Sequence, residues 1–151
     1  MSTIRLARPE DLAQLLGLYE QLTNRSIPNE IPAQDEALAA LWREILDNPN
    51  YHVVVAEAEG RAVSTCTLVI VANLTHNQRP YALVENVVTD RAYRKRGLGS
   101  AVLAYAREIA LRRGCYKMML MTGTRLESTL RFYERAGYNR EDKTGFIQWL
   151  E

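Results

Sequence analysis

Long apolar runs are absent from this sequence. No apolar stretch approaches the roughly 18 residues that a membrane-spanning helix needs. Residues 1–10 already carry Arg5, Arg8 and Glu10, unlike a secretory signal peptide. Internal repeats and low-complexity tracts are also lacking. We therefore expect a cytoplasmic protein without membrane association, folded as one domain over residues 1–151.

Cysteine is scarce. Cys66 and Cys115 form no C-x-x-C pair and no zinc-ligand pattern, so we predict no metal site. Both lie in apolar surroundings, which favours buried, reduced thiols because free cysteine behaves as a small hydrophobic residue. A catalytic cysteine is the alternative, since distance in sequence from His52 and His76 does not exclude a Cys/His pair.

Net charge is only +1, but the charges are unevenly distributed. Residues 1–90 hold 6 Lys/Arg and 12 Asp/Glu, whereas residues 91–151 hold 13 and 6. Such asymmetry indicates an anionic partner, either nucleic acid or a polyanionic cofactor. The basic half lacks both the aromatic–basic interleaving of stacking surfaces and a helix-turn-helix pattern, so we expect no nucleic-acid binding.

Hydrophobic periodicity predicts an α+β fold. Alternating or β-branched segments indicate strands, and apolar residues at helical spacing indicate helices. The expected order is β-α-α-β-β-β-α-β-α-β, which gives a mixed, largely antiparallel sheet with helices on both faces. The predicted strands are 3–7, 52–57, 62–72, 81–89, 116–121 and 143–150, and the predicted helices are 9–22, 33–46, 98–113 and 127–136.

A basic glycine loop follows the predicted strand 81–89 and opens the helix from residue 98. The first turn of a helix presents unpaired N–H groups, glycines allow close approach of a phosphate, and Arg and Lys add charge-assisted bonds. The loop is neither a Walker A sequence nor a dinucleotide fingerprint, because Val102 stands where the third small residue would be. What it fits is R-x-x-G-x-G, with Arg94, Gly97 and Gly99.

This pattern resembles the acetyl-CoA signature of the GNAT superfamily of N-acetyltransferases. The predicted element order is similar to the whole fold of that family, and residues 131–138, R-F-Y-E-R-A-G-Y, look like its F-Y-E-K-L-G-F segment. The resemblance implies acetyl-CoA as co-substrate and often a homodimer. It assigns cofactor binding to Val87, Val88, Thr89, Arg94, Lys95, Arg96, Gly97, Leu98, Gly99, Ser100, Ser128 and Tyr133.

Three catalytic positions are implied by the same resemblance. Tyr133 would protonate the departing thiolate, and the Val87 N–H would stabilise the oxyanion of a tetrahedral intermediate. Glu85 lies in an apolar strand and would act as a base or bind the amine; a structural ion pair or a surface position is the alternative. Period-2 alternation predicts that Glu85 and Val87 share a face.

The acceptor is less closely defined. Residues 84–88 and 114–117 resemble eukaryotic glucosamine-6-phosphate N-acetyltransferases, but the C-terminal segment lacks the paired arginines of those enzymes. Arg25, Arg79 or residues from a second subunit would have to replace them. Leu126 stands where relatives often carry an Asn that contacts CoA. We expect a small polar amine as acceptor, with a protein amine or a non-catalytic CoA sensor as alternatives. By resemblance, the acceptor pocket would draw on Tyr19, Asn24, Arg25, Asn29, Trp42, Thr122 and Thr124, although Tyr19 and Trp42 also suit a core.

Overall fold

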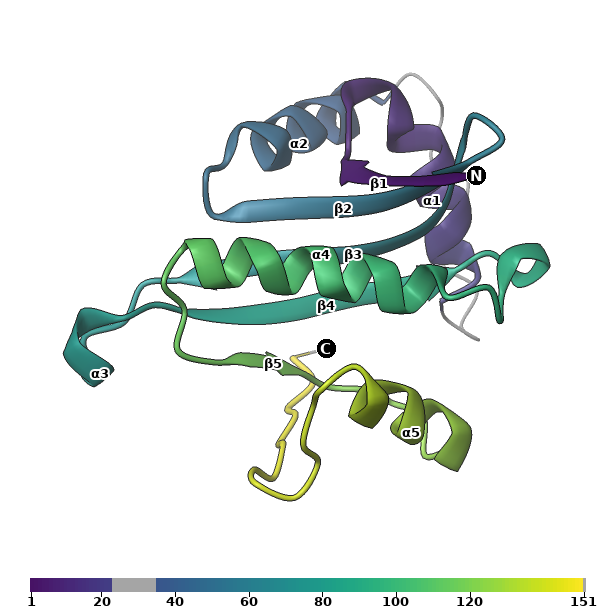
Figure 1. The fold of residues 1–151 in the computed structure, drawn as a ribbon. Coiled ribbons are helices and arrows are strands. Elements are labelled where there is room, and N and C mark those ends of the chain that lie inside the picture. Colours follow the sequence, from purple (N-terminus) through teal and green to yellow (C-terminus); the bar gives the residue numbers. More distant parts are fainter. Residues whose placement is uncertain (23–34, 151) are drawn as a thin grey trace.

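A five-stranded sheet in the order β1-β2-β3-β4-β5 forms the centre of the protein (Figure 1). The computed structural model describes residues 1–22 and 35–150. Neighbouring strands are antiparallel except β4 and β5, which are parallel. The strands are β1 (Ser2–Leu6), β2 (Tyr51–Ala58), β3 (Arg61–Val71), β4 (Tyr81–Thr89) and β5 (Met118–Leu120).

Helices cover both faces of this sheet, as predicted. A 3-10 turn (Pro9–Asp11) leads into α1 (Leu12–Glu20), and α2 (Glu36–Asp47) begins where the Asp35 carboxylate accepts hydrogen bonds from two backbone N–H groups. Packed on the other face, α4 (Leu98–Arg112) runs along β3 and β4, and α5 (Glu127–Arg135) lies beside β5 (Figure 1). Gly114 and Gly137 have positive φ angles just after these two helices, the usual way for a helix to end.

The sheet separates two apolar cores. Beneath α4, Val54, Leu68 and Val84 are buried against Val102 and Leu103. On the opposite face, Val53 and Val55 are buried against α1 and α2, chiefly by Leu15, Leu18 and Trp42. The indole N–H of Trp42 donates to the carbonyl of Pro9 at 3.0 Å, so the predicted core position of Trp42 is confirmed.

An extra residue interrupts the pairing of β3 with β4. Thr65 pairs with Val88 and Thr67 pairs with Glu85, so Asn86 and Val87 both lie opposite Cys66. This is a β-bulge, which leaves backbone out of the ladder and changes which face the following side chains occupy.

The predicted strand 143–150 does not form. Within residues 1–22 and 35–150, no strand pairs with this stretch. Lys143, Thr144 and Gly145 border the same cavity as β5. The side chain of Met121 lies against Gly145, within 3.1 Å of the position a Cβ would take. Apolar residues in this stretch are therefore not sufficient to make it a strand.

Other boundaries also differ from expectation. β5 is three residues long rather than spanning 116–121, and the predicted loop 73–80 contains the short α3 (Thr75–Gln78), whose His76 and Asn77 have left-handed backbone angles. The expected loop 24–32 lies outside the described residues. None of the helices within 1–22 and 35–150 is both long and apolar enough to cross a bilayer.

A buried ionic network fixes the start of the chain. The guanidinium of Arg5 binds Asp11 at 2.7 and 3.0 Å and Glu57 at 2.8 Å, which ties β1 to the first turn and to β2. The Asp11 carboxylate also accepts the Arg8 N–H at 2.7 Å. Burial alone would raise the pKa of Asp11, but these hydrogen bonds outweigh it and hold the pKa below its ordinary value.

Replacing Asp11 with Ala should lower the free energy of unfolding by about 3 kcal/mol at pH 7, because Arg5 and the Arg8 N–H lose a buried partner. A carboxylate with a lowered folded-state pKa stabilises the fold above its unfolded pKa of about 3.9 and loses this effect as the pH falls. The difference in free energy of unfolding between wild type and Asp11→Ala should therefore become smaller as the pH falls from about 5 to about 2. Urea unfolding measures both, with exposed Glu10→Ala as the control. An equal loss for Glu10→Ala would contradict the assignment.

Candidate functional site

The connection between β4 and α4 places a sharply turned loop at a helix N-terminus. After a 3-10 turn (Arg91–Tyr93), Lys95 and Gly97 adopt left-handed φ angles of 61° and 78°, and Gly97 is the N-cap of α4. Left-handed residues alternating with ordinary ones aim successive backbone N–H groups at one point, a concavity suited to an anion. The N–H groups of residues 98–100 have no partner within the helix.

Contacts from elsewhere in the chain hold this loop. Asp90 donates its N–H to the Val63 carbonyl at 2.8 Å, and its carboxylate accepts the Ala92 N–H at 2.8 Å. Gln21, just after α1, accepts the Arg91 N–H at 3.0 Å. Sequence reasoning missed both anchors, since Gln21 lies 70 residues from its partner. The loop is thus positioned from α1 and β3 as well as from β4.

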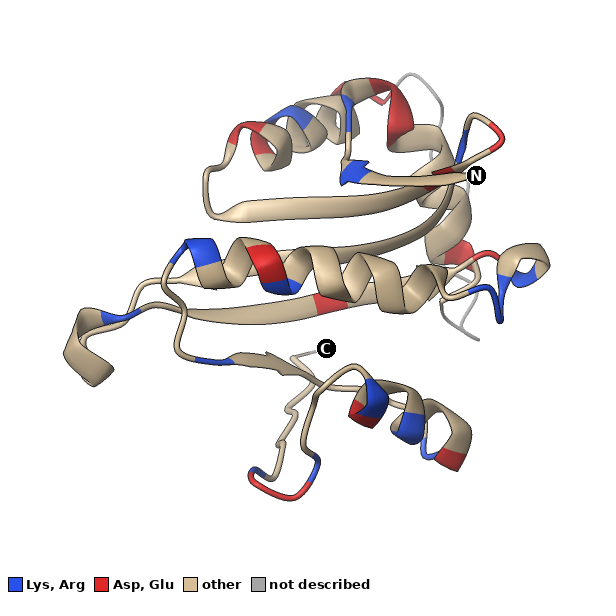
Figure 2. Cartoon of the chain, viewed as in Figure 1, with Lys and Arg blue, Asp and Glu red and all other residues tan. Residues whose placement is uncertain are grey.

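Cations gather around the same loop (Figure 2). Arg94, Lys95 and Arg96 are all exposed. The Nε of Arg94 donates to the Thr89 carbonyl at 3.1 Å, and the Arg96 guanidinium lies 5.0 Å from the centre of the Tyr93 ring. These contacts orient two guanidinium groups beside the N-terminus of α4, where a phosphate or diphosphate would meet both side-chain and backbone donors.

Gly99 has a packing reason of its own. A Cβ here would lie 3.1 Å from the ring of Phe132 and 3.5 Å from the Thr89 hydroxyl. The missing side chain therefore lets α5 approach the first turn of α4. Leu98 is buried beneath this turn, whereas Ser100 is exposed on it.

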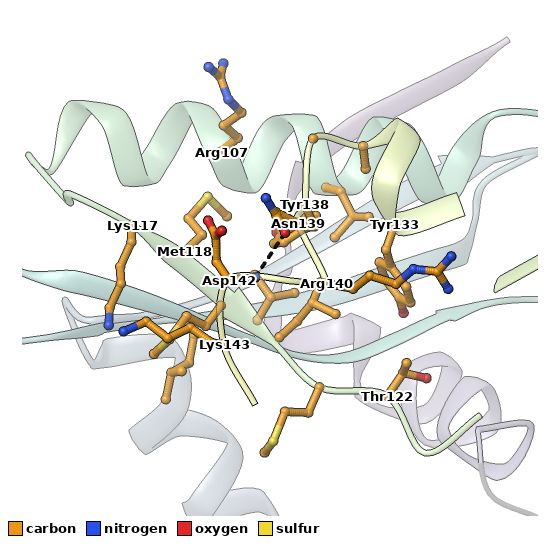
Figure 3. Close-up of a pocket in the computed structure, with 18 of the residues that line it drawn as sticks. Arg107, Lys117, Met118, Thr122, Tyr133, Tyr138, Asn139, Arg140, Asp142 and Lys143 are labelled. Atoms are coloured by element: carbon orange, nitrogen blue, oxygen red, sulfur yellow. Dashed lines mark hydrogen bonds between the residues drawn. The ribbon is translucent and has the colours of Figure 1, made fainter. Parts of the chain in front are cut away.

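A cavity of about 820 Å³ opens beside β4 and β5. The ladder between these strands ends at Val84 and Leu120, so the edge of β4 is uncovered by β5 from Glu85 onward. Glu85, Thr122 and Tyr133 all line the cavity. In Figure 3, Thr122 and Tyr133 lie at the end away from Lys117. The structure therefore brings two of the three predicted catalytic residues to one cavity.

Tyr133 is half-buried among aromatic rings. Its ring lies 5.0 Å from that of Phe132 and 6.3 Å from that of Tyr138, both edge to face. Burial raises the pKa of its phenol above the ordinary value, so the hydroxyl stays protonated at neutral pH. Within residues 1–22 and 35–150, no hydrogen bond engages this hydroxyl, and it can serve a ligand as a donor.

The expectation that Glu85 and Val87 share a face is wrong. Thr67, directly opposite Glu85, borders a second cavity on the side of α1 and α2, and paired residues share a face. Val87 packs instead against the core beneath α4. The bulge at Asn86 causes the difference, because one additional residue reverses the alternation. The sequence signal for this bulge was Asn86, an Asn inside a β-branched strand. Its φ is 53°, a left-handed angle that Asn tolerates.

The remaining predicted positions are scattered around this site. Val88 is buried on the α1–α2 face, and Thr89 hydrogen-bonds Ser64 through their hydroxyls at 2.7 Å. Ser128 is exposed in the first turn of α5. Leu126 is the N-cap of that helix but offers no side-chain acceptor, and it is exposed.

Both cysteines are buried, as predicted. Burial raises the pKa of the Cys66 thiol to about 12 and that of Cys115 above its ordinary value. Because the thiolate is the nucleophile, neither side chain is activated at neutral pH. His52 lies beside Arg113 and His76 stacks on Tyr116, so neither histidine is paired with a cysteine.

Residues 15–138 match the acetyltransferase (GNAT) family, and the chain belongs to this family of acyltransferases. The family prediction and the predicted α+β architecture are therefore confirmed.

Two glucosamine 6-phosphate N-acetyltransferases are among the relatives. The chain is 36% identical to that of Trypanosoma brucei brucei over 84 residues, 56% of this chain and 55% of the relative. It is 31% identical to one from Oryza sativa subsp. japonica over 134 residues, 87% of this chain and 79% of the relative. The chain thus spans about half the length of the trypanosomal relative.

A solved structure from Agrobacterium tumefaciens strain C58, which carries an acetyltransferase designation, superposes with a TM-score of 0.86 at 40% identity. The match covers 97% of this chain and 99% of that one. It extends the likeness in fold across the entire candidate site.

The left-handed angle of Gly97 predicts a difference between two glycines. Gly97→Ala should lower the free energy of unfolding by about 1 kcal/mol, since a Cβ is strained at this φ. Gly17→Ala within α1 should raise it by about 0.5 kcal/mol, because alanine favours helix. Neither Cβ would meet an atom within 4 Å, so the backbone alone separates the two outcomes in urea unfolding. Equal changes would show that Gly97 is not held in this conformation.

Proposed function

We propose that the protein transfers an acetyl group from acetyl-CoA to the primary amine of a small metabolite, by direct attack in a ternary complex. The observation that carries this proposal is the loop 94–100, where cations and unpaired N–H groups converge at the N-terminus of α4 beside the uncovered edge of β4. Membership of the acetyltransferase family supports the donor. The names of the trypanosomal and rice relatives support a small-molecule amine as acceptor.

The loop would hold the diphosphate of acetyl-CoA. Backbone N–H groups of residues 96–100 and the side chains of Arg94, Lys95, Arg96 and Ser100 are the donors available there. The pantetheine arm, which carries amide groups, would pair with backbone of Val87, Val88 and Thr89 along the edge of β4, in the manner of an added strand. That edge is uncovered because the β4–β5 ladder stops at Val84.

In the proposed reaction, the amine nitrogen attacks the thioester carbonyl carbon and its proton passes to Glu85, directly or through water. The Val87 N–H would stabilise the oxyanion, and its position in the bulge supports this, since a bulge leaves backbone unpaired. The intermediate then expels the CoA thiolate, which takes a proton from Tyr133. The raised pKa of this phenol suits a proton donor.

Two other functions make distinguishable predictions. A protein or peptide amine as acceptor would give turnover with peptides and none with small amines. A CoA sensor without catalysis would bind acetyl-CoA tightly, yet Tyr133→Phe and Glu85→Gln would change no rate. Thiol release from acetyl-CoA across panels of amines and peptides separates these from the proposed reaction.

Removing two loop cations should weaken donor binding. The double variant Arg94→Ala, Arg96→Ala should raise the KM for acetyl-CoA at least about 10-fold, because a hydrogen bond to a charged group contributes roughly 1.5–3 kcal/mol. Raising the salt concentration should increase the wild-type KM as well, since these side chains are exposed. Thiol release at saturating amine measures both effects. Arg112→Ala, at the far end of α4, is the control and should leave KM unchanged. An unchanged KM in the double variant would remove the basis for the loop's role.

Tyr133→Phe should lower kcat about 100-fold while the KM for acetyl-CoA changes little, since general-acid catalysis contributes at least this much. Because burial raises the pKa of Tyr133 above its ordinary value of about 10, deprotonation of this phenol should reduce kcat only above pH 10 or so. This alkaline decline should be missing from the variant. Tyr105→Phe, on α4, serves as the control. Wild-type kcat in Tyr133→Phe would exclude the phenol as the proton donor.

A further inference from the structure

A second cavity lies on the opposite side of β4, beneath α1 and α2. Its volume is about 170 Å³. Leu12, Leu16 and Tyr19 from α1 and Leu41 and Ile45 from α2 form much of its wall, and the sheet closes its base. The cavity is therefore shaped by the two helices that precede β2 and is separate from the larger cavity beside β5.

The described wall of this cavity contains no charged side chain. Its polar groups are the hydroxyls of Tyr19, Tyr51 and Thr67 and the amide of Asn86, while the indole N–H of Trp42 is already bonded to Pro9. Burial raises the pKa of Tyr19, so this phenol stays neutral. Among the described residues of this wall, a phosphate would find no cation to offset its lost hydration, which is unfavourable.

Two adjacent residues at the bulge in β4 line the two cavities. Asn86 lines the small cavity, whereas its chain neighbour Glu85 lines the larger cavity. Both residues are exposed, and Thr67, the partner of Glu85 across the ladder, lines the same wall as Asn86. An amine whose stem occupied the small cavity would hold its nitrogen beside the Glu85 carboxylate.

Of the cations considered for a phosphosugar, Arg79 does not contribute to this wall. Arg79 lies at the other end of β4, where its guanidinium donates to the carbonyls of Gly114 and Cys115 at 3.1 and 3.2 Å. Arg25, Asn24 and Asn29 lie outside the described residues. Thr122 borders the larger cavity instead.

We propose that the acceptor is a primary amine on a short apolar stem, and this proposal rests on the proposed acetyl transfer. The stem would be an aromatic ring or a branched alkyl group about the size of benzene. A cavity of about 150 Å³ lined by apolar side chains is known to hold benzene, and the cavity here is of similar volume. The stem fills the space beneath α1 and α2, and the ammonium lies at the mouth near Asn86 and Glu85. This proposal departs from the expected small polar amine, because the polarity of the acceptor would be confined to its amine group.

The experiment compares thiol release with phenethylamine, 3-methylbutylamine, glucosamine and glucosamine 6-phosphate, each with saturating acetyl-CoA. The kcat/KM for the two apolar amines should exceed that for glucosamine 6-phosphate at least about 10-fold, the discrimination that an apolar pocket provides. Equal or higher kcat/KM for glucosamine 6-phosphate would overturn the apolar-acceptor assignment and leave acetyl transfer intact. No thiol release with any amine would overturn the proposed function instead.

A cavity-filling variant tests the location. Leu16→Trp should raise the KM for phenethylamine about 10-fold and leave the KM for acetyl-CoA unchanged, whereas Leu74→Trp, at an 88% exposed residue between β3 and β4, should change neither. Phenethylamine titrated without acetyl-CoA and followed by NMR should shift α1 and α2 resonances saturably in wild type and not in Leu16→Trp. This binding is independent of turnover, so its absence in wild type overturns the cavity assignment even if acetyl transfer fails. Circular dichroism establishes that both variants fold.

Discussion

One additional residue in β4 determines how the candidate site is arranged. Because Asn86 and Val87 share a single partner, Cys66, the strand reverses its inward and outward faces at this point. Glu85 borders the larger cavity and Asn86 the smaller one, and Val87 turns toward the core beneath α4. Without the bulge, Val87 would follow Glu85 onto the side of α1 and α2. The proposed donor and acceptor sites therefore both adjoin this irregularity.

The loop 94–100, the proposed diphosphate site, depends on a different kind of support. Its turn is local, since Lys95 and Gly97 bend the backbone and α4 begins immediately afterwards. Its position depends on residues distant in sequence, because Gln21 and the Val63 carbonyl accept hydrogen bonds from N–H groups at the start of the turn before it. The cations beside it are exposed, and Arg94 and Arg96 are oriented by the Thr89 carbonyl and the Tyr93 ring.

Periodicity predicted most of the fold because buried faces leave a regular pattern. The stripe in α2 and the β-branched runs in β2 and β4 were sufficient to give element order and type. The loop was equally visible, since glycine, arginine and a helix start lie together in the sequence. Alternation failed at Asn86, where one extra residue shifts the register, and at residues 143–150, with which no strand of the described chain pairs. Pairing partners and cavity walls come from distant segments, and no local pattern contains them.

The contact between Gly99 and Phe132 joins the two motifs that first suggested the family. The ring of Phe132 occupies the space that a side chain at position 99 would need, and the next residue in the chain is Tyr133. Variation at positions 99 and 132 should therefore be correlated among related sequences, with a larger residue at one accompanied by a smaller residue at the other. The glycine of the loop and the aromatic residue of α5 should in this sense vary as a pair.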